Sequence, residues 1–293
     1  MDGWDEIRTA YHVARLGTVS GAAEALGVHH ATVIRHIDAL EARLGTKLFQ
    51  RHARGYTATE AGQDLQQVAQ TTSEQFTHLV GRLKGLGETV AGELTVTSLG
   101  PLSGLLVPGI ARFQLLHPEL MVRFLTDDRL FRLEYGEAHV AIRAGTAPDQ
   151  PDNVVQKLAR VHAAIYASET YIKQRGMPDV DGDLSGHVFV GHDLENTPAP
   201  FYRWLDARVG RASVTFRTAD ARATLAAVEN GAGLGFVSLW EAVRTPGLVQ
   251  VAPPRDEWSS QLWLVTHVDL HRTAKVQALS THLKAEAKSW GDV

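Results

Sequence analysis

Apolar positions near the start of the chain repeat with the period of an α-helix. In the segment 4–16 they are spaced by three or four positions: Trp4, Ile7, Tyr11 and Ala14. Gly17 follows in the position typical of a helix C-terminus. The pattern predicts an amphipathic first helix whose apolar face packs against neighbouring elements.

Two further helices are expected to meet at a glycine turn. Ser20 offers a hydroxyl for the N-cap of a short Ala-rich helix, and Gly27 permits a sharp turn after it. The third helix is expected over about residues 30–44, with one apolar stripe: Val33, Ile37, Leu40 and Leu44. Its other face holds a different set: His30, Ile34, Arg35 and Asp38. Periodicity alone fits both a helix-turn-helix that presents this face to a DNA groove and a three-helix bundle with a solvated face.

The next segment, GTKLFQRHARGYTATEAG at residues 45–62, predicts a β-hairpin. Leu48 and Phe49 anchor its first strand, Gly55 marks the turn, and Thr59 is expected to cap the following helix. Basic side chains surround the turn: Arg51, His52 and Arg54. Because arginines at the tip of such a wing suit phosphate or minor-groove contacts, the hairpin favours the DNA-binding interpretation.

A long helix is expected at residues 59–87. Its apolar positions alternate steps of four and three: Leu65, Ala69, Thr72, Phe76, Leu79, Leu83 and Leu86. A heptad seam of this length predicts pairing with another helix. The alternative is a helix that lies on its own domain, but the position after a DNA-binding module favours dimerisation, and two such modules would read the half-sites of an interrupted palindrome.

From residue 92 the pattern changes to alternating strands and helices. The expected strands are Glu93–Leu99, Met121–Thr126, Val140–Arg143, Ala163–Ala167, Val188–Gly191, Ser213–Thr218, Gly235–Ser238 and Gln261–Thr266. Helical segments such as 105–116 and 221–230 lie between several of them. The alternation predicts mixed, mostly parallel sheets with helices on both faces, arranged in two α/β lobes.

Composition narrows the class of protein. The chain has 293 residues, of which 44% are hydrophobic and 21% charged, so it is long enough for two or three globular domains. It has no cysteine, which excludes disulfides, thiolate catalysis and cysteine-ligated zinc. No secretory signal and no apolar run of membrane-spanning length is visible, so we expect a cytoplasmic protein without a membrane partner.

Charge points to a local patch rather than to the whole chain. The formal net charge is −4, which does not by itself indicate a nucleic-acid binder. Residues 29–56 nevertheless hold five arginines and lysines against two acidic residues: Arg35, Arg43, Lys47, Arg51 and Arg54 against Asp38 and Glu41. A patch of this kind can attract phosphates.

The sequence contains little that indicates an enzymatic or metal-binding site. The 14 histidines form no His-Glu-x-x-His or similar ligand pattern, so no metal site is expected. The sequence GAGLG at 231–235 lacks phosphate-loop and dinucleotide spacing and predicts only a tight turn. No Gly-x-Ser-x-Gly elbow occurs, and we expect neither a cofactor nor an enzymatic activity.

The N-terminal run GTVSGAAEALGVHHATVIRHIDALEARLGTKLFQRHARGYTATEAG resembles the winged helix-turn-helix of LysR-type transcriptional regulators, and the resemblance covers residues 4–62. Family members usually carry Ser-Gln-Pro-Ala-Val-Ser-Arg at the start of the recognition helix. Here Arg35 keeps the arginine, His30 replaces the glutamine, and Ile34 replaces a hydroxyl, which leaves the operator sequence open. Ile34 could contact a thymine methyl or serve only packing. The residues expected to contact DNA are Ser20, His29, His30, Ala31, Thr32, Ile34, Arg35, Arg51 and Arg54.

The C-terminal half is similar to the effector-binding half of the same family, which resembles periplasmic solute-binding proteins. The stretches that carry this likeness are GELTVTSLGPLSGLLVPGIARFQLLHPELMVRF, GEAHVAIRAG and ATLAAVENGAGLGFVS, with His139 where the family often has an aspartate. The resemblance implies an α+β multi-domain protein: a winged helix-turn-helix (1–62), a linker and dimerisation helix (59–88), and an effector domain (92–293). Its first lobe is expected at about 92–162 and 267–293, and its second at about 163–266.

A ligand is expected between the lobes, where strands end. The candidate residues are Ser98, Leu99, Gly100, Ser103, Thr126, Arg143, His192, Phe201 and Thr218. Singly, a serine or threonine at such a position is more often a helix cap than a ligand contact, and an aromatic such as Phe201 is more often part of the core. Arg143 could bind a ligand carboxylate or an acidic neighbour.

The resemblance implies a DNA-binding regulator, dimeric or a dimer of dimers, that responds to a small molecule, with RNA polymerase as a further partner. Two alternatives stay open. A repressor could use its C-terminal half only for assembly, and a solute-binding protein could carry an unrelated helical N-terminus. The second predicts a signal peptide or lipid anchor and leaves the basic hairpin unexplained.

Overall fold

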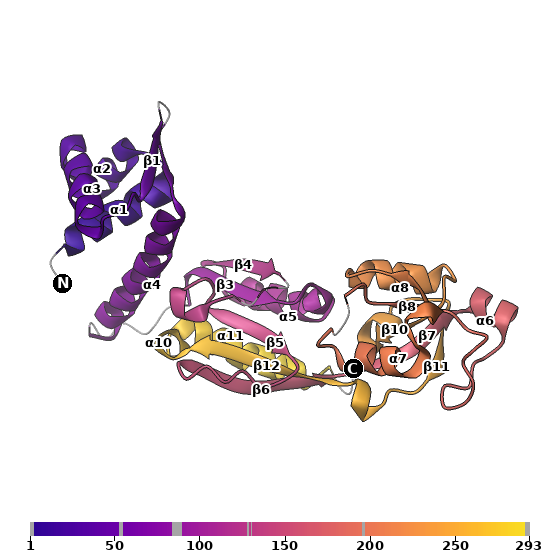
Figure 1. The fold of residues 1–293 in the computed structure, drawn as a ribbon. Helices are drawn as coiled ribbons and strands as arrows, with labels where there is room; N and C mark the ends of the chain where they lie inside the picture. The colour runs from indigo at the N-terminus through magenta and orange to yellow at the C-terminus, as the bar shows by residue number, and fades with distance from the viewer. Residues whose placement is uncertain are drawn as a thin grey trace. The chain divides into compact units, whose positions relative to one another are not determined.

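The computed structural model describes residues 3–52, 55–83, 90–127, 129, 131–194 and 197–290. The chain divides into two compact units, which are described separately: residues 1–89 with 132–138, and residues 90–131 with 139–293 (Figure 1). Among the described residues, no helix has the length and apolar character needed to cross a bilayer.

Three helices open the first unit: α1 (Trp4–Leu16), α2 (Val19–Leu26) and α3 (His30–Leu44). Each ends at a glycine in the left-handed region, with φ of 70° at Gly17, 66° at Gly27 and 68° at Gly45. The expected N-cap at Ser20 is wrong. Thr18 caps α2, because its hydroxyl accepts a hydrogen bond from the Gly21 amide at 3.1 Å, and Ser20 lies exposed in the first turn.

The expected apolar stripe of α3 holds except at its last position. Val33, Ile37 and Leu40 are buried in the core of the first unit. Leu44 is instead 51% exposed, and the buried residue of that turn is Glu41, which is 3% exposed. A carboxylate in a core position requires polar partners, and the wing supplies them.

The hairpin and the long helix follow as expected. Strands β1 (Phe49–His52) and β2 (Gly55–Ala58) pair antiparallel. Helix α4 (Glu60–Leu83) begins after Thr59, whose hydroxyl accepts a hydrogen bond from the Gly62 amide at 3.2 Å. Along the predicted heptad seam, Ala69 is buried and Phe76 is 52% exposed. The side chains of Leu79 and Leu83, and all of Leu86, lie outside the described part of the chain.

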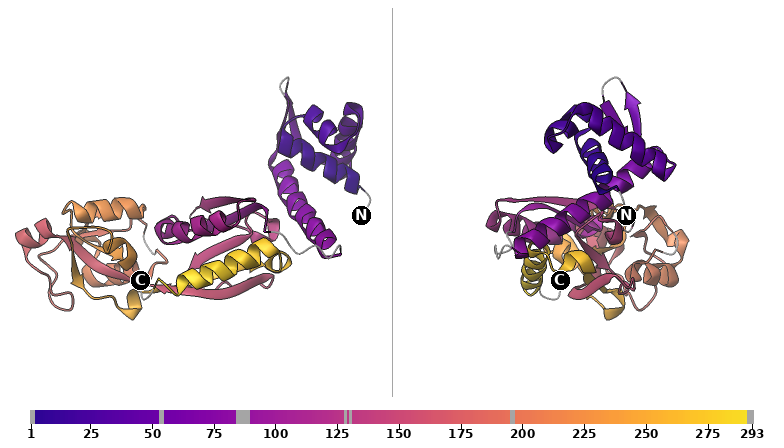
Figure 2. Two further views of the ribbon diagram at one scale, coloured as in Figure 1. Left: turned by 180° about the vertical axis from the view of Figure 1, so that it is seen from behind. Right: turned by 90° about the vertical axis from the view of Figure 1, so that its left-hand side faces the viewer.

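The second unit contains two mixed five-stranded sheets. The first has the order β4-β3-β5-β12-β6. Its strands are β3 (Gly92–Ser98), β4 (Leu120–Thr126), β5 (Val140–Ala144), β6 (Asn153–Val161) and β12 (Ser260–His267). Its helical elements are η1 (Gly100–Leu102), α5 (Ser103–Leu116), α10 (Val268–His271) and α11 (Ala274–Ala287). Helices α5 and α11 lie side by side over one core on the sheet (Figure 2).

The second sheet has the order β11-β7-β10-β8-β9. Its strands are β7 (Ala163–Ser168), β8 (Phe189–Gly191), β9 (Val214–Arg217), β10 (Leu234–Ser238) and β11 (Leu248–Ala252). Its helices are α6 (Glu169–Arg175), α7 (Pro200–Val209), α8 (Ala221–Glu229) and α9 (Leu239–Ala242). Alternate residues of β7 enter separate apolar cores on the two faces, so this sheet is covered on both sides, as expected.

Two expectations for this unit are corrected. The sheets are not mostly parallel, because each has two parallel and two antiparallel strand pairs. Residues 260–266 were expected in the second lobe, but β12 pairs with β5 and β6 in the first sheet. Strands β6 and β11 were not predicted. The chain therefore crosses back to the first lobe before residue 260.

Trp240 connects the two lobes of the second unit. It belongs to α9, which follows the second sheet, yet its side chain is part of the core of the first sheet. Gly104 in α5 makes room for its ring, since a Cβ at Gly104 would lie 2.6 Å from Trp240 Cζ3. Arg244 adds a hydrogen bond of 3.3 Å to the Gly104 carbonyl.

We predict that Gly104→Ala lowers the free energy of unfolding by about 1–3 kcal/mol, because overpacking forces Trp240 out of its position. Denaturant titration of the full chain measures the change. Gly100→Ala is the matched control, because its Cβ would meet no heavy atom within 4 Å. The loss should shrink in a Trp240→Leu background. If Gly104→Ala and Gly100→Ala lower the free energy of unfolding equally, close packing of Trp240 against Gly104 is not the cause.

Candidate nucleic-acid interface

Helix α3 has one buried and one exposed stripe. Ala31, Arg35, Asp38 and Ala42 are spaced by four, three and four residues, and all four are exposed. The opposite stripe, which includes Val33 and Ile37, is fully buried. The buried apolar stripe therefore packs the helix onto the core, and the opposite stripe remains accessible to a partner along the helix.

The expected DNA-contacting residues differ in how the structure places them. Those exposed on or just before α3 are His29, His30, Ala31 and Arg35. Thr32 and Ile34 are half-buried, and Ile34 packs against the core of the first unit. Ser20 is exposed on α2. Arg54 lies outside the described residues. Four of the exposed residues of the predicted set thus cluster at the N-terminal end of α3, whereas Ser20 and Arg51 lie on other elements.

Helix α3 is also tied to α1 by a polar contact. The Thr9 hydroxyl donates its proton to the Asp5 carbonyl at 2.6 Å. His36 Nδ1 lies 2.9 Å from the same oxygen and must therefore be the donor in this second contact.

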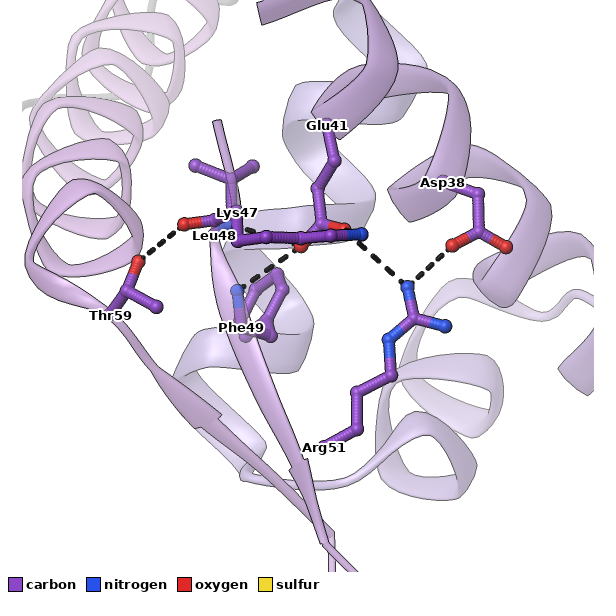
Figure 3. A network of polar contacts seen from close by, with 7 residues as sticks. All are labelled: Asp38, Glu41, Lys47, Leu48, Phe49, Arg51 and Thr59. Atoms are coloured by element: carbon purple, nitrogen blue, oxygen red, sulfur yellow. Dashed lines mark hydrogen bonds and ion pairs between the residues drawn. The ribbon is translucent and has the colours of Figure 1, made fainter. Parts of the chain in front are cut away.

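The buried Glu41 carboxylate joins the end of α3 to the base of the wing (Figure 3). Its Oε1 accepts hydrogen bonds from two successive amides, Leu48 at 2.9 Å and Phe49 at 3.2 Å. Its Oε2 accepts from Lys47 Nζ at 2.7 Å and lies 3.5 Å from Arg51 Nη2. Burial alone would raise the pKa of Glu41, but the hydrogen bonds from Lys47, Leu48 and Phe49 outweigh it and lower that pKa.

Arg51 is already engaged by the protein. Its Nη2 donates to Asp38 Oδ1 on the exposed stripe of α3, and its guanidinium lies 5.4 Å from the centre of the Tyr56 ring in β2. The expected role was a contact with DNA. That role stays a prediction. In the structure Arg51 lies between the wing and α3, where its contacts fix one against the other.

Further contacts hold the wing at its base and side. The Tyr56 amide donates to the Gly17 carbonyl at 2.9 Å. The Thr59 hydroxyl donates to the Lys47 carbonyl at 2.7 Å, and the Thr59 amide to the Leu48 carbonyl at 2.9 Å. A Cβ at Gly55 would lie 2.5 Å from the Gly17 oxygen, so this turn requires glycine.

In the second unit, the expected ligand residues of the first lobe gather at one sheet edge. Ser98 ends β3 in register with Thr126, which ends the parallel strand β4. Ser98 is 5% exposed, and its Oγ is buried without a hydrogen-bond partner in the described part of the chain. Leu99 and Gly100 follow directly, and the Ser103 hydroxyl donates to the Gly100 carbonyl at 2.7 Å.

Arg143 is the last but one residue of β5, near the same edge, and its side chain contacts its own lobe. Its guanidinium donates to the Phe131 carbonyl at 3.1 Å and to Gln150 Oε1 at 3.4 Å. Both of these acceptors are uncharged, and the two roles left open for Arg143, binding a ligand carboxylate or pairing with an acidic neighbour, stay predictions.

The candidate residues of the second lobe accept hydrogen bonds within turns or pack on the core. His192 Nδ1 accepts from the Leu194 amide at 3.0 Å, and Thr218 Oγ1 accepts from the Asp220 amide at 3.0 Å. The Phe201 ring lies 4.6 Å from that of Tyr202 and packs on the core. Thr218 lies next to the end of β8, because its amide donates to the Gly191 carbonyl at 3.1 Å.

Some residues near this region were not predicted. Helix α8, which follows Thr218, contacts η1 of the first lobe. The Trp240 Nε1 donor is buried without a partner in the described residues. Burial raises the pKa of Tyr202 and, against hydrogen bonds from Ser238, that of Glu241. No spacing in the sequence links these residues to the strand ends. Across the described ranges, no group of three His, Cys, Asp or Glu side chains could hold a metal ion.

The Glu41 network predicts a local effect of Glu41→Gln. We expect hydrogen exchange of peptides spanning 45–60 to accelerate as if the wing had lost about 1.5–3 kcal/mol, because hydrogen bonds to a charged acceptor become neutral. The lowered pKa of Glu41 gives stability that is present above the ordinary value of 4.5 and is lost as the pH falls through the folded value. The difference between wild type and variant should therefore close in acid. Exposed Glu24→Gln is the control, and a constant difference down to pH 3 would contradict the prediction.

Comparison with known proteins assigns the family. The model of the bacterial regulatory helix-turn-helix protein, lysR family, matches residues 4–63, and that of the LysR substrate binding domain matches residues 87–288. The chain is 29% identical over 280 residues to the probable HTH-type transcriptional regulator LtrA of Klebsiella pneumoniae, which covers 91% of this chain and 89% of that protein.

Solved structures share the fold. ArgP from Mycobacterium tuberculosis has a TM-score of 0.68 at 17% identity, over 98% of both chains. LysG from Corynebacterium glutamicum has a TM-score of 0.65 at 18% identity, over 99% of both chains. With both family models matched in order along the sequence, this chain belongs to the LysR family of transcriptional regulators, with an N-terminal helix-turn-helix and a C-terminal effector-binding domain.

Proposed function

We propose that this regulator reads duplex DNA with the exposed stripe of α3, while its wing contacts the flanking backbone. The observation that supports this most directly is the pairing of the two elements by Glu41, which presents helix and hairpin as one rigid surface. Phosphate contacts would supply most of the affinity and α3 most of the specificity. DNA binding in turn implies a cytoplasmic location.

Within that surface, the residues proposed to touch bases are at the start of α3. Arg35 is exposed and makes no ion pair or hydrogen bond within the described ranges. Its guanidinium suits the two acceptors of guanine. His29, His30 and Ala31 flank it, and Ile34 keeps part of its surface accessible for a thymine methyl.

We also propose that α4 pairs with a second copy of the chain. A cavity of about 440 Å³ lies between α1 and α4 and is lined by aromatic, apolar and some polar side chains: Trp4, Ile7, Arg8, Tyr11, His12, Ala69, Ser73 and Phe76. Trp4 and Phe76 remain exposed there, which favours a protein partner for this surface. Two modules joined in this way would read an interrupted palindrome, as a dimer or within a dimer of dimers that also contacts RNA polymerase.

For the effector, we propose a small carboxylate bound beside Ser98 at the N-terminal end of α5. The buried Ser98 hydroxyl has no hydrogen-bond partner in the described ranges, which supports a ligand there, because buried polar groups usually have a partner. The solved LysG structure contains bound effector Arg, which supports a small-molecule ligand in this fold. Binding would shift the regulator only if the ligand favours one arrangement of the lobes. A ligand-independent repressor is the alternative.

Arg35→Ala should weaken binding to a duplex selected from the source genome by about 1–3 kcal/mol, with a smaller loss on random DNA, because a base contact is removed. Band-shift titration at fixed salt measures both. Arg222→Ala, an exposed arginine of the effector half, is the control. Unchanged affinity on both duplexes would remove Arg35 from the interface.

Thermal-shift screening of small carboxylates and aromatic acids tests the effector site. A true effector at 100 times its Kd should stabilise the chain by about 2.7 kcal/mol. Ser98→Ala should abolish that shift while leaving the unliganded chain equally or more stable, because a buried unpaired hydroxyl is lost. If no ligand class stabilises the wild type, the assembly-only alternative is favoured.

A further inference from the structure

Asp38 is an acidic side chain on the exposed stripe of α3, between Arg35 and Ala42. Its side chain is 51% exposed. If this stripe faces DNA, a carboxylate there is repelled by the phosphates and has no favourable contact with acceptor groups of the bases. It becomes favourable only where the major groove offers a hydrogen-bond donor.

The structure holds Asp38 in one orientation. Arg51 Nη2 donates to Oδ1, and the same nitrogen lies 3.5 Å from Glu41 Oε2. The other oxygen of that carboxylate, Oε1, accepts from the Leu48 and Phe49 amides, which hold the Glu41 side chain in place. Oδ2 has no contact within the part of the chain that the structure describes, and it points away from Arg51 (Figure 3). One oxygen is thus anchored and the other is available.

We propose that Asp38 is a specificity-determining residue that accepts a hydrogen bond from the N4 amino group of a cytosine, with Arg51 as its positioning residue. Cytosine fits because it shows a donor in the major groove without an adjacent acceptor. Adenine also has an amino donor, but its neighbouring N7 repels a carboxylate, and guanine presents two acceptors. The assignment rests on the proposed DNA-facing role of α3.

The positive charge of Arg51 also supports the proposed role of Asp38. As a cation beside Asp38, it offsets the repulsion between that carboxylate and the phosphates on either side of the groove. It is also held by the Tyr56 ring and by Glu41, so the orientation of Asp38 does not depend on DNA being present. Such preorganisation favours discrimination between bases.

Selection from a randomised duplex library with the full-length chain tests the proposal. The wild type should enrich a motif with one cytosine in each half-site that is preferred by roughly 5- to 150-fold over other bases. Asp38→Ala should lose the preference at that position alone and keep the rest of the motif. It should also bind all duplexes somewhat more tightly, because a negative charge is removed. Glu24→Ala, which removes one exposed carboxylate from α2, should leave the motif unchanged.

Each other outcome contradicts the proposal. If Asp38→Ala keeps the full motif and only gains affinity uniformly, Asp38 is a screened surface charge. If Arg51→Gln lowers the affinity for all duplexes but leaves the preference for cytosine unchanged, the positioning role of Arg51 is wrong. A residue that positions Asp38 must change the preference at that one base, whereas a merely structural residue would weaken binding to all sequences alike. If the wild type enriches no motif, sequence-specific binding itself fails, and this inference fails with it.

Discussion

One buried carboxylate sets the geometry of the DNA-binding unit. Glu41 occupies a core position on α3, where a free charge would be strongly unfavourable, and two main-chain amides and two cations of the following segment satisfy it. Because these partners lie at the start of the wing, satisfying the charge also fixes the hairpin against the recognition helix. The orientation of Arg51 and Asp38 follows from the same contact, so the whole surface depends on it.

The effector half is organised by crossings of the chain between its two sheets. Strand β12 returns to the first sheet after the second is complete, and Trp240 places a side chain from the second lobe in the core of the first. The ends of β3 and β4 lie in register, and η1, which follows β3, contacts α8 of the other lobe. Ser98 lies there, and its buried hydroxyl has no hydrogen-bond partner among the residues that the structure describes, which is the basis for the ligand site proposed above.

Short-range patterns predicted the helices well and the polar contacts poorly. The expected segments 4–16 and 30–44 match α1 and α3, because each ends at a glycine that adopts a left-handed conformation. Spacing placed Leu44 in the core, yet the core position belongs to Glu41, whose partners lie seven and eight residues further on. Strand β6 was missed because most of its residues are half-buried and do not alternate clearly between buried and exposed. The antiparallel pairing of β12 with β6 was missed because it joins segments about a hundred residues apart in the sequence. The ligand-site residues were chosen from strand ends, and their binding role stays a prediction. In the structure, His192 and Thr218 accept hydrogen bonds within turns, and Phe201 packs on the core.

The absence of cysteine from the sequence allows a direct test of the central claim, that α3 and the wing together face DNA. A single cysteine at Ala31→Cys, Thr57→Cys or Ala226→Cys can carry an iron chelate that cleaves nearby DNA, since all three positions are exposed. The account predicts cleavage centred within each half-site from position 31, cleavage at the flanks from position 57, and none above background from position 226. Equal cleavage from all three, or none from 31, would contradict it.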